Sequence, residues 1–166
     1  MRFRAEHIFK GIDLNAYETL YFDEAFNIAM CKAVKLSRAL VKLDEKAGRI
    51  ERAVKVGPDR EIPPAVAKVL GVSRIEYTEH VVYTRGSYRG IWHTVSSVFT
   101  DKVDSRGNFS FEAVPGGVKR VVEGEIKVKV FGVGGVIERF IVADVERSYD
   151  DAAKFTELTL QQRSKA

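Results

Sequence analysis

The last third of the chain changes from a strand pattern to a helix pattern across one glycine-rich turn. In residues 118–131, Val122, Ile126 and Val128 alternate with charged residues, which is typical of a strand with one buried face and one solvated face. From residue 135 to about residue 162, apolar side chains recur every three or four positions, which predicts an amphipathic helix. Such a helix is about 40 Å long at 1.5 Å per residue. We therefore expect it to pack across the sheet to which the strand belongs.

Most of the preceding chain follows a period of two. Arg2–Lys10 predicts a first strand, and six more strands are expected at 35–44, 49–56, 74–85, 89–100, 108–114 and 118–131. Short turn signals such as EKAG, RGSY, DSRG and VPGG separate most of them. Because parallel neighbours need long crossover connections, these short turns indicate antiparallel hairpins.

Three shorter helices are expected outside the strands. Residues 13–34 predict two helices broken near Phe22–Asp23, with Asp13 or Asn15 as the first cap. The segment IPPAVAKVL predicts a short helix over one end of the sheet, ending at Gly71. The fold class is therefore α+β, with a seven-stranded antiparallel sheet, two short helices after the first strand and a long C-terminal helix, in a single domain, 1–166.

The glycine-rich turn raises the question of a nucleotide site, because a strand, a glycine loop and a helix bind phosphates in many enzymes. The spacing is Gly132-x-Gly134-Gly135, and Ile137 stands where the dinucleotide fingerprint requires its last glycine. No strand follows the helix, and Val136 and Ile137 replace the lysine and hydroxyl residue of a P-loop. We therefore interpret the glycines as a sharp turn off the last strand.

Three polar residues, Glu79, His93 and Ser97, occupy positions that the alternation assigns to apolar strand faces. A hairpin turning near Gly86–Tyr88 would bring them together. Because a buried carboxylate needs a partner or water, this cluster suggests an interior that is not wholly dry, such as a ligand cavity with a few polar groups. The alternative is a carboxylate at a bulge or wet edge and a satisfied core histidine. A catalytic triad is disfavoured, since nothing around Ser97 resembles a nucleophile elbow.

The other chemistry-bearing residues give weaker signals. His7, His80 and His93 lie on different strands without metal-ligand spacing, and His80 is expected to point away from His93, so we predict no metal site. Trp92 is expected to face outward, either packing against the early helices or forming a partner or membrane contact. We predict no cofactor and no catalytic residue.

Composition and charge limit the binding partners and the compartment that we expect for the protein. The net charge of +4 is spread along the chain without a basic block, so nucleic-acid binding is not expected, while a transient contact with anionic lipid is compatible with it. Cys31 is the only cysteine, which suits a reducing compartment such as the cytoplasm. We expect no signal peptide, no membrane span, and a monomer or weak homodimer.

The closing segment VPGGVKRVVEGEIKVKVFGVGGVIERFIVADVERSYDDAAKFTEL resembles the last hairpin, glycine turn and grip helix of the START-like superfamily, also called SRPBCC or helix-grip. The Gly134-Gly135 turn, Glu138 and the Tyr149–Phe155 stretch carry the resemblance, and the insert PDREIPPAVAKVLG looks like a bacterial branch of unknown function. The resemblance implies a curved sheet wrapped around the long helix, with a hydrophobic ligand between them. It implies no catalytic residue, because the superfamily shares none.

These patterns lead to three functional hypotheses. The first is binding or transfer of a lipid, quinone or polyketide-like molecule, with the IPPAVAKVL helix as a lid. The second is a polyketide cyclase or dehydratase that uses His93 and Glu79 as acid and base. The third is a protein-interaction module without a ligand, using an apolar patch around Trp92. The candidate cavity residues are Tyr77, Glu79, Tyr83, His93, Val95, Ser97, Phe99, Phe109, Phe111, Ile126, Val128, Ile137, Ile141 and Val145.

Overall fold

The computed structural model describes residues 1–59 and 61–166, and Arg60, in the loop expected before the short middle helix, lies outside the described residues. The strands form one antiparallel sheet in the order β1-β7-β6-β5-β4-β3-β2. The strands are β1 (Arg2–Lys10), β2 (Leu36–Lys46), β3 (Arg49–Pro58), β4 (Tyr77–Thr84), β5 (Arg89–Ser96), β6 (Val103–Val114) and β7 (Gly117–Val128). The helices are α1 (Leu14–Phe22), α2 (Glu24–Ala33), α3 (Pro64–Leu70) and α4 (Gly134–Ser164).

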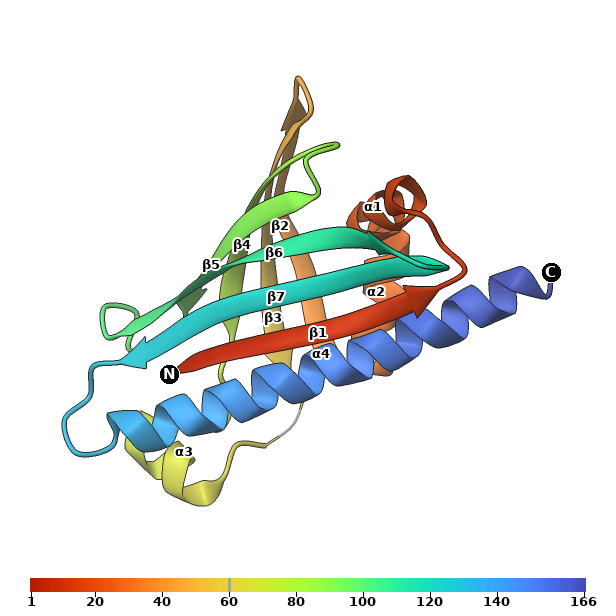
Figure 1. The fold of residues 1–166 in the computed structure, drawn as a ribbon. Helices are drawn as coiled ribbons and strands as arrows, with labels where there is room; N and C mark the ends of the chain where they lie inside the picture. Colours follow the sequence, from red (N-terminus) through yellow and green to blue (C-terminus); the bar gives the residue numbers. More distant parts are fainter. Residues whose placement is uncertain (60) are drawn as a thin grey trace.

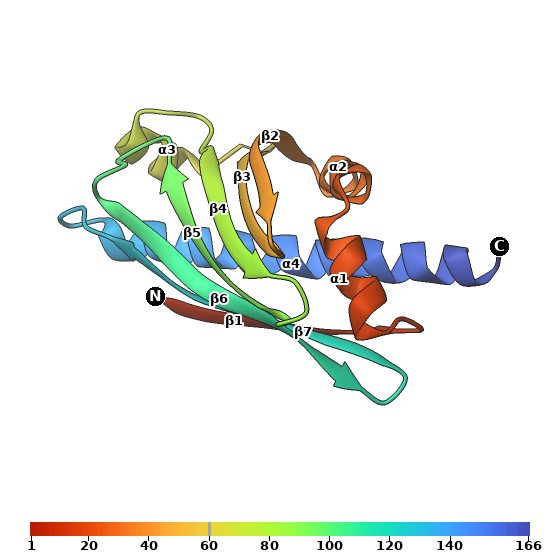
Figure 2. The ribbon, with the colours of Figure 1, turned by 90° about the horizontal axis from the view of Figure 1, so that it is seen from above.

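The long helix α4 runs along the whole curved sheet, beside β1 and β7, with α1 and α2 at one end and α3 near the other (Figures 1 and 2). This arrangement confirms the predicted α+β class, the seven-stranded antiparallel sheet and the long C-terminal helix. The space between sheet and helix is therefore the place where a site has to be sought.

One aspartate separates the two short helices. The backbone N–H of Asp23 donates to the carbonyl oxygen of Leu20 at the end of α1, and its carboxylate accepts from the N–H of Phe26 at 2.8 Å at the start of α2. Asp13 caps α1 in the same way, through the N–H of Ala16 at 2.8 Å. The break expected near Phe22–Asp23 thus exists because Asp23 satisfies donors that a continuous helix would bond internally.

The β5–β6 connection differs from the sequence prediction. β5 ends at Ser96 rather than residue 100, and β6 begins at Val103 rather than 108. Phe99 adopts a left-handed φ of 48°, and its carbonyl oxygen accepts hydrogen bonds from the N–H groups of Lys102 and Val103. The hydroxyl of Thr100 donates to the carbonyl oxygen of Ser96 at 2.9 Å. Apolar Val98 and Phe99 suggested a longer strand, but these bonds make the segment a turn.

The glycine turn serves the fold, as expected. Gly132 has a φ of 79°, which favours glycine, and a Cβ on Gly134 would overlap the carbonyl oxygen of Val128. The carboxylate of Glu138 accepts a hydrogen bond from the N–H of Val128 at 2.8 Å. The start of α4 is thereby tied back to the end of β7, the strand that precedes it.

An aromatic cluster closes the sheet at the end covered by α1. Its members pack with ring centroids between 4.7 and 6.3 Å apart: Phe9, Tyr17, Tyr21, Phe22, Tyr83, Phe109 and Phe111. The buried hydroxyl of Tyr83 donates to the carboxylate of Glu18 on α1 at 2.5 Å, and that carboxylate also accepts from the N–H of Gly86 at 2.8 Å. This end of the molecule is filled core rather than cavity.

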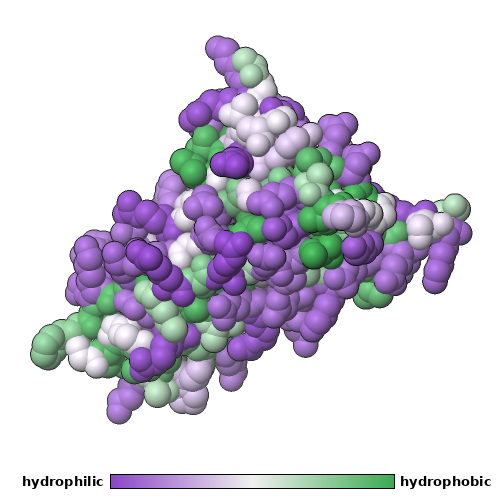
Figure 3. Space-filling model, in the orientation of Figure 1, coloured by the Kyte–Doolittle hydropathy of each residue, from purple (hydrophilic) through white to green (hydrophobic). Residues whose placement is uncertain are grey.

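The outer surface in the view of Figure 3 is mostly hydrophilic, with apolar residues in several small separate areas. None of the helices in the described part of the chain is long and apolar enough to cross a membrane.

Candidate functional site

A cavity of about 210 Å³ lies between the sheet and α4. Its wall is mostly apolar and draws on all seven strands, on α1, α2 and α4, and on the segments that flank α3. The apolar lining consists of Phe3, Met30, Cys31, Leu36, Val56, Pro58, Ile62, Ile75, Trp92, Val103, Ile126, Phe140, Ile141, Val145 and Ala152. The lining residues that carry polar groups are Tyr21, Asn27, Arg38, Arg52, Tyr77, Glu79, Thr94, Ser96, Ser105, Arg120, Asp144, Ser148 and Tyr149.

Only part of the candidate set lies on this wall. Tyr77, Glu79, Ile126, Ile141 and Val145 line the cavity. The others lie elsewhere: Tyr83, Phe109 and Phe111 in the aromatic cluster, Val128 and Ile137 in the packed core, His93 and Val95 on the opposite face of β5, and Ser97 and Phe99 in the turn after β5. These positions do not line the cavity for four reasons. The aromatic end is filled, the inward and outward positions of β5 are exchanged, β5 ends at Ser96, and Val128 and Ile137 pack into the core.

β5 is the strand whose inward and outward positions are exchanged. Its inward residues are Trp92, Thr94 and Ser96, while Ile91 and Val95 are 60% and 40% exposed on the outer face. The alternation of Ile91 with Val95 suggested the reverse. The indole of Trp92 packs where a Cβ on Gly107 or Gly124 would overlap it, so two neighbouring strands leave room for the largest side chain inside. Trp92 is consequently only 8% exposed, so the expected outward patch is not centred on it.

The expected cluster of Glu79, His93 and Ser97 does not form either. Glu79 pairs in register with Thr94, and His93 pairs with His80 on the outer face. The two histidine rings stack with centroids 4.7 Å apart and planes at 6°, which corrects the expectation that they point apart. Burial, the nearby His80 and Arg106 all lower the pKa of His93. His93 therefore stands outside the cavity and has no role in its chemistry.

Two buried arginines supply the cavity's most unusual chemistry. Arg52 on β3 is 7% exposed, and its guanidinium lies over the rings of Tyr21 and Phe22 at 5.7 and 5.3 Å. Its Nη2 lies 3.6 Å from a carboxylate oxygen of Glu79, close enough for an ion pair but beyond good hydrogen-bond distance. Its Nε and Nη1 have no hydrogen-bond partner among residues 1–59 and 61–166.

The second arginine, Arg120 on β7, is 4% exposed. Its Nη2 donates to Nδ1 of His7 at 3.0 Å and to the carbonyl oxygen of Tyr149 at 3.4 Å. Its guanidinium lies 5.3 Å from the ring centroids of both Phe9 and Tyr149. Its Nε has no partner in the described part of the chain, and the same holds for Nε1 of Trp92.

Two tyrosines of the wall, Tyr21 and Tyr149, stay neutral. Burial raises the pKa of Tyr21 to about 12, although the charge of Arg52 and, more weakly, of Arg120 opposes the rise. Burial also raises the pKa of Tyr149 well above its usual range. The cavity therefore combines neutral phenol groups, two cations with unused donors and a largely apolar surface.

A third arginine of the wall is already satisfied. Arg38 on β2 forms a two-pronged ion pair with Glu24 on α2, with its Nε and Nη2 at 2.9 and 2.8 Å from the two carboxylate oxygens. This pair lowers the pKa of Glu24. Arg38 thus holds α2 against the sheet and differs from Arg52 and Arg120, whose donors are only partly used.

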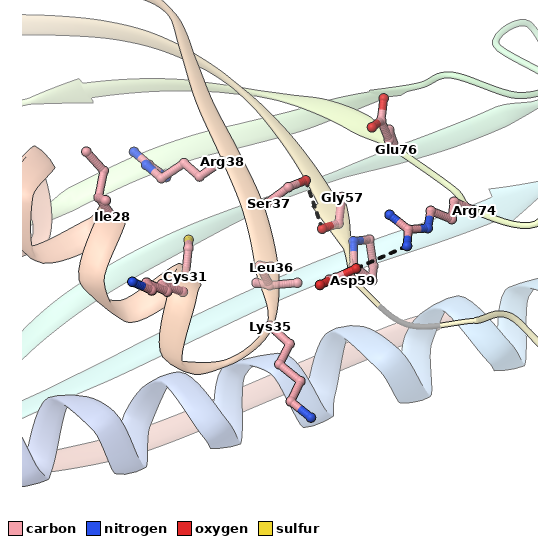
Figure 4. A pocket seen from close by; sticks show the side chains of 12 residues that line it. Ile28, Cys31, Lys35, Leu36, Ser37, Arg38, Gly57, Asp59, Arg74 and Glu76 are labelled. Carbon is pink, nitrogen blue, oxygen red and sulfur yellow. Dashed lines mark hydrogen bonds and ion pairs between the residues drawn. The ribbon is translucent and has the colours of Figure 1, made fainter.

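An open groove of about 340 Å³ adjoins the cavity between α2 and the β2–β3 end of the sheet. Figure 4 shows its polar rim, where Arg74 pairs with Asp59 at 3.2 Å and Lys35 extends towards α4. The groove and the cavity share four wall residues, Cys31, Leu36, Arg38 and Pro58. The groove and the cavity therefore lie against the same four residues.

Sequence reasoning missed both arginines, although a signal existed. Arg52 lies an even number of residues from Ile50, Val54 and Val56, and therefore on the same buried face of β3. Arg120 lies in the same way on the buried face of β7 with Val118 and Val122. A lone arginine at an inward position of an apolar strand is the mark of a functional or strongly paired cation. Among the described residues, no group of three or more histidine, cysteine, aspartate or glutamate side chains is placed to hold a metal ion.

A family profile described as "Protein of unknown function (DUF2505)" matches residues 7–160, and the chain belongs to this family. A comparison with curated proteins found no match.

Several solved structures share the fold. A protein from Thermus thermophilus is 14% identical with a TM-score of 0.69, over 99% of each chain. An aromatase/cyclase from Streptomyces sp. R1128 is 10% identical with a TM-score of 0.67, over 100% of this chain and 98% of that one. A Mycobacterium smegmatis protein is 13% identical with a TM-score of 0.63, over 96% and 90%. At these identities the likeness shows the fold alone, which is of the helix-grip type.

Proposed function

We propose that the protein binds a hydrophobic small molecule, such as a lipid, quinone or polyketide-like compound, in the cavity between the sheet and α4. The observation that carries the proposal is the cavity itself, which is lined mainly by apolar side chains at the centre of the fold. Ligand sites are concave, mostly apolar and supplied with a few convergent polar groups, and this wall has that composition.

The fold supports the proposal by analogy. The START-like resemblance of the closing segment agrees with the likeness to a protein named as an aromatase/cyclase. Fold alone does not fix function, so the analogy adds support only for the general class of ligand. The adjoining groove provides the entrance. The segment leading into α3 places Ile62 in the cavity wall, and α3 serves as the lid over it.

The two other hypotheses lose their structural basis in part. The cyclase hypothesis needs His93 inside the cavity as its base, but this ring lies on the outer face of β5. An interaction surface centred on Trp92 loses its centre, because the indole lies inside. Binding without catalysis therefore explains the placement of the side chains best.

The single tryptophan of the chain makes the test direct. Because Trp92 is part of the wall, its fluorescence should change when a neutral apolar probe such as decanol or N-phenyl-naphthylamine enters the cavity. Ala152→Phe fills the cavity from α4 and should weaken binding about tenfold or more, an effect in the range known for a clash in a close-packed site.

Ala143→Phe is the matched control, since it adds the same ring to the exposed side of α4 and should leave the affinity unchanged. Circular dichroism checks that both variants fold. If neither neutral probe changes the Trp92 signal and native mass spectrometry finds no bound molecule, the proposal is wrong. Equal losses of affinity in both variants would also contradict it.

A further inference from the structure

We infer that the ligand of this cavity is an amphipathic acid, with an apolar body and one anionic oxygen group, typically a carboxylate, held by Arg52 and Arg120. The inference rests on the proposed function and specifies the class of ligand. It starts from the polar atoms of the wall rather than from its volume.

The first step is the count of unused donors. Nε and Nη1 of Arg52, Nε of Arg120 and Nε1 of Trp92 are all buried and have no partner among residues 1–59 and 61–166. All three side chains are more than nine-tenths buried and line the same cavity. Since buried polar groups in proteins are almost always hydrogen-bonded, donors gathered on one cavity indicate a ligand that supplies acceptors.

The second step is the charge of the wall. Arg38 is balanced by Glu24, and Arg52 stands beside Glu79 at 3.6 Å. Arg120 differs, because its described hydrogen-bond partners, His7 and the carbonyl oxygen of Tyr149, carry no negative charge. The wall also contains the carboxyl group of Asp144, and the carboxylate of Asp150 bonds the far nitrogen of His7. The described hydrogen bonds of Arg120 reach neither carboxylate, so an anionic ligand group would give this buried cation a direct negative partner and lower the cost of its burial.

The third step is preorganisation. The guanidinium of Arg52 lies over Tyr21 and Phe22, and that of Arg120 lies over Phe9 and Tyr149. Both arginines belong to the wall of the same cavity, Arg52 from β3 and Arg120 from β7. Their guanidinium groups are therefore held by packed rings beside that space before any ligand arrives. Planar guanidinium groups fixed in this way suit the planar carboxylate.

The fourth step is the rest of the wall, which excludes a bare inorganic anion as the intended ligand. Ile126, Phe140, Ile141 and Val145 leave a small ion with nothing to fill the remaining space. The volume of 210 Å³ is below the roughly 300–1,000 Å³ typical of drug-sized ligands, so a short ligand suits it. A medium-chain fatty acid and a bicyclic aromatic acid share this chemistry.

The experiment compares acids with their neutral counterparts of the same shape. Decanoate and decanol form the aliphatic pair, and naphthoate and naphthol form the aromatic pair, with affinities measured by Trp92 fluorescence and by calorimetry. We expect the better acid to bind about tenfold to a hundredfold more tightly than its alcohol, the usual difference for a hydrogen-bonded charge. The pair that binds more tightly tells whether the body is aliphatic or aromatic.

Variants locate the effect. Arg120→Gln and Arg52→Gln should each reduce the preference for the acid at least about tenfold, while the affinity for the alcohol changes little. Arg106→Gln removes the same charge from the outer face of β6, where the side chain is 71% exposed, and should keep the preference. If Arg120→Gln does not fold, Arg52→Gln still tests the inference, because each arginine is expected to contribute to the tighter binding of the acid over the alcohol.

The outcomes separate this inference from the function on which it rests. Equal affinities for acid and alcohol in the wild-type protein overturn the inference and leave the apolar site intact. A preference for the acid that survives both cavity variants also overturns it. Failure of every probe, neutral or acidic, means instead that the proposed function is wrong.

Discussion

Arg120 on β7 donates a hydrogen bond to Nδ1 of His7 on the neighbouring strand β1, at 3.0 Å. Because a guanidinium has no acceptor, Nδ1 must be the accepting nitrogen, and the proton of the neutral ring sits on Nε2. Nε2 lies 2.7 Å from a carboxylate oxygen of Asp150 on α4, to which it donates. One chain of hydrogen bonds thus joins β7, β1 and α4 and orients the buried cation at the cavity wall.

Replacement of His7 tests this chain. In His7→Phe the guanidinium of Arg120 stays buried and loses its best acceptor, so the free energy of unfolding should fall by about 1–3 kcal/mol. Urea denaturation measures the change. Asp150→Asn is the control, because its amide oxygen still accepts from Nε2 and its side chain is 63% exposed, and it should change stability by less than about 0.5 kcal/mol. A His7→Phe protein as stable as the wild type would contradict this role.

The elements of the fold were predictable because each rests on local chemistry. The change from a period of two to a helical period located β7 and α4, and the left-handed Gly71 ended α3 as expected. Asp23 marked the helix break through its own hydrogen bonds. The likeness of the closing segment to helix-grip proteins agreed with the observed arrangement of sheet and helix.

The candidate site was harder to predict, because it depends on contacts between strands. Which residues of β5 point inward depends on Gly107 on β6 and Gly124 on β7, because these glycines make room for the indole of Trp92. The sequence of β5 alone contains no sign of this space. The choice between cavity and core for Tyr83, Phe109 and Phe111 depends on α1, which covers that end. Glu79, Arg52 and Arg120 each carried a local signal, a charge at an inward strand position, and only Glu79 was recognised from it.

Tyr83 tests the boundary between core and cavity. In Tyr83→Phe the carboxylate of Glu18 loses a buried donor at 2.5 Å and keeps the N–H of Gly86, so the free energy of unfolding should fall by about 1.5–3 kcal/mol. The affinity for the cavity probes should not change, because Tyr83 lies outside the lining. Denaturation and Trp92 titration on the same sample measure both effects, and a loss of affinity without a loss of stability would return Tyr83 to the site.

The charge of Glu138 should contribute to the way the free energy of unfolding falls at acid pH. Its hydrogen bond from the N–H of Val128 holds the pKa of this carboxyl below its ordinary value of 4.5. A carboxyl with a depressed folded-state pKa stabilises the fold above its unfolded-state pKa, and the contribution is lost as the pH falls through the folded-state value. The wild type should therefore exceed Glu138→Gln by about 1 kcal/mol near neutral pH, and the difference should vanish in acid below that value.

Urea titrations at a series of pH values measure this difference. The comparison is informative because the glutamine oxygen can still accept from Val128, so only the charge-dependent part is removed. A difference between the two proteins that stays constant across the acid range would show that the charge of Glu138 does not contribute.

The two glycines at the start of α4 should respond in opposite directions to the same substitution. A Cβ on Gly134 would overlap the carbonyl oxygen of Val128, so Gly134→Ala must displace the end of β7 and should lower the free energy of unfolding by about 1–3 kcal/mol. A Cβ on Gly135 meets only a nitrogen of Arg139 at 3.9 Å, and the residue is helical. Gly135→Ala should raise the free energy of unfolding by about 0.4–1 kcal/mol, because alanine restricts the unfolded chain. Thermal and urea unfolding of both variants decide the matter: equal effects would mean that the close approach of Gly134 to β7 does not fix the turn that sends α4 across the sheet.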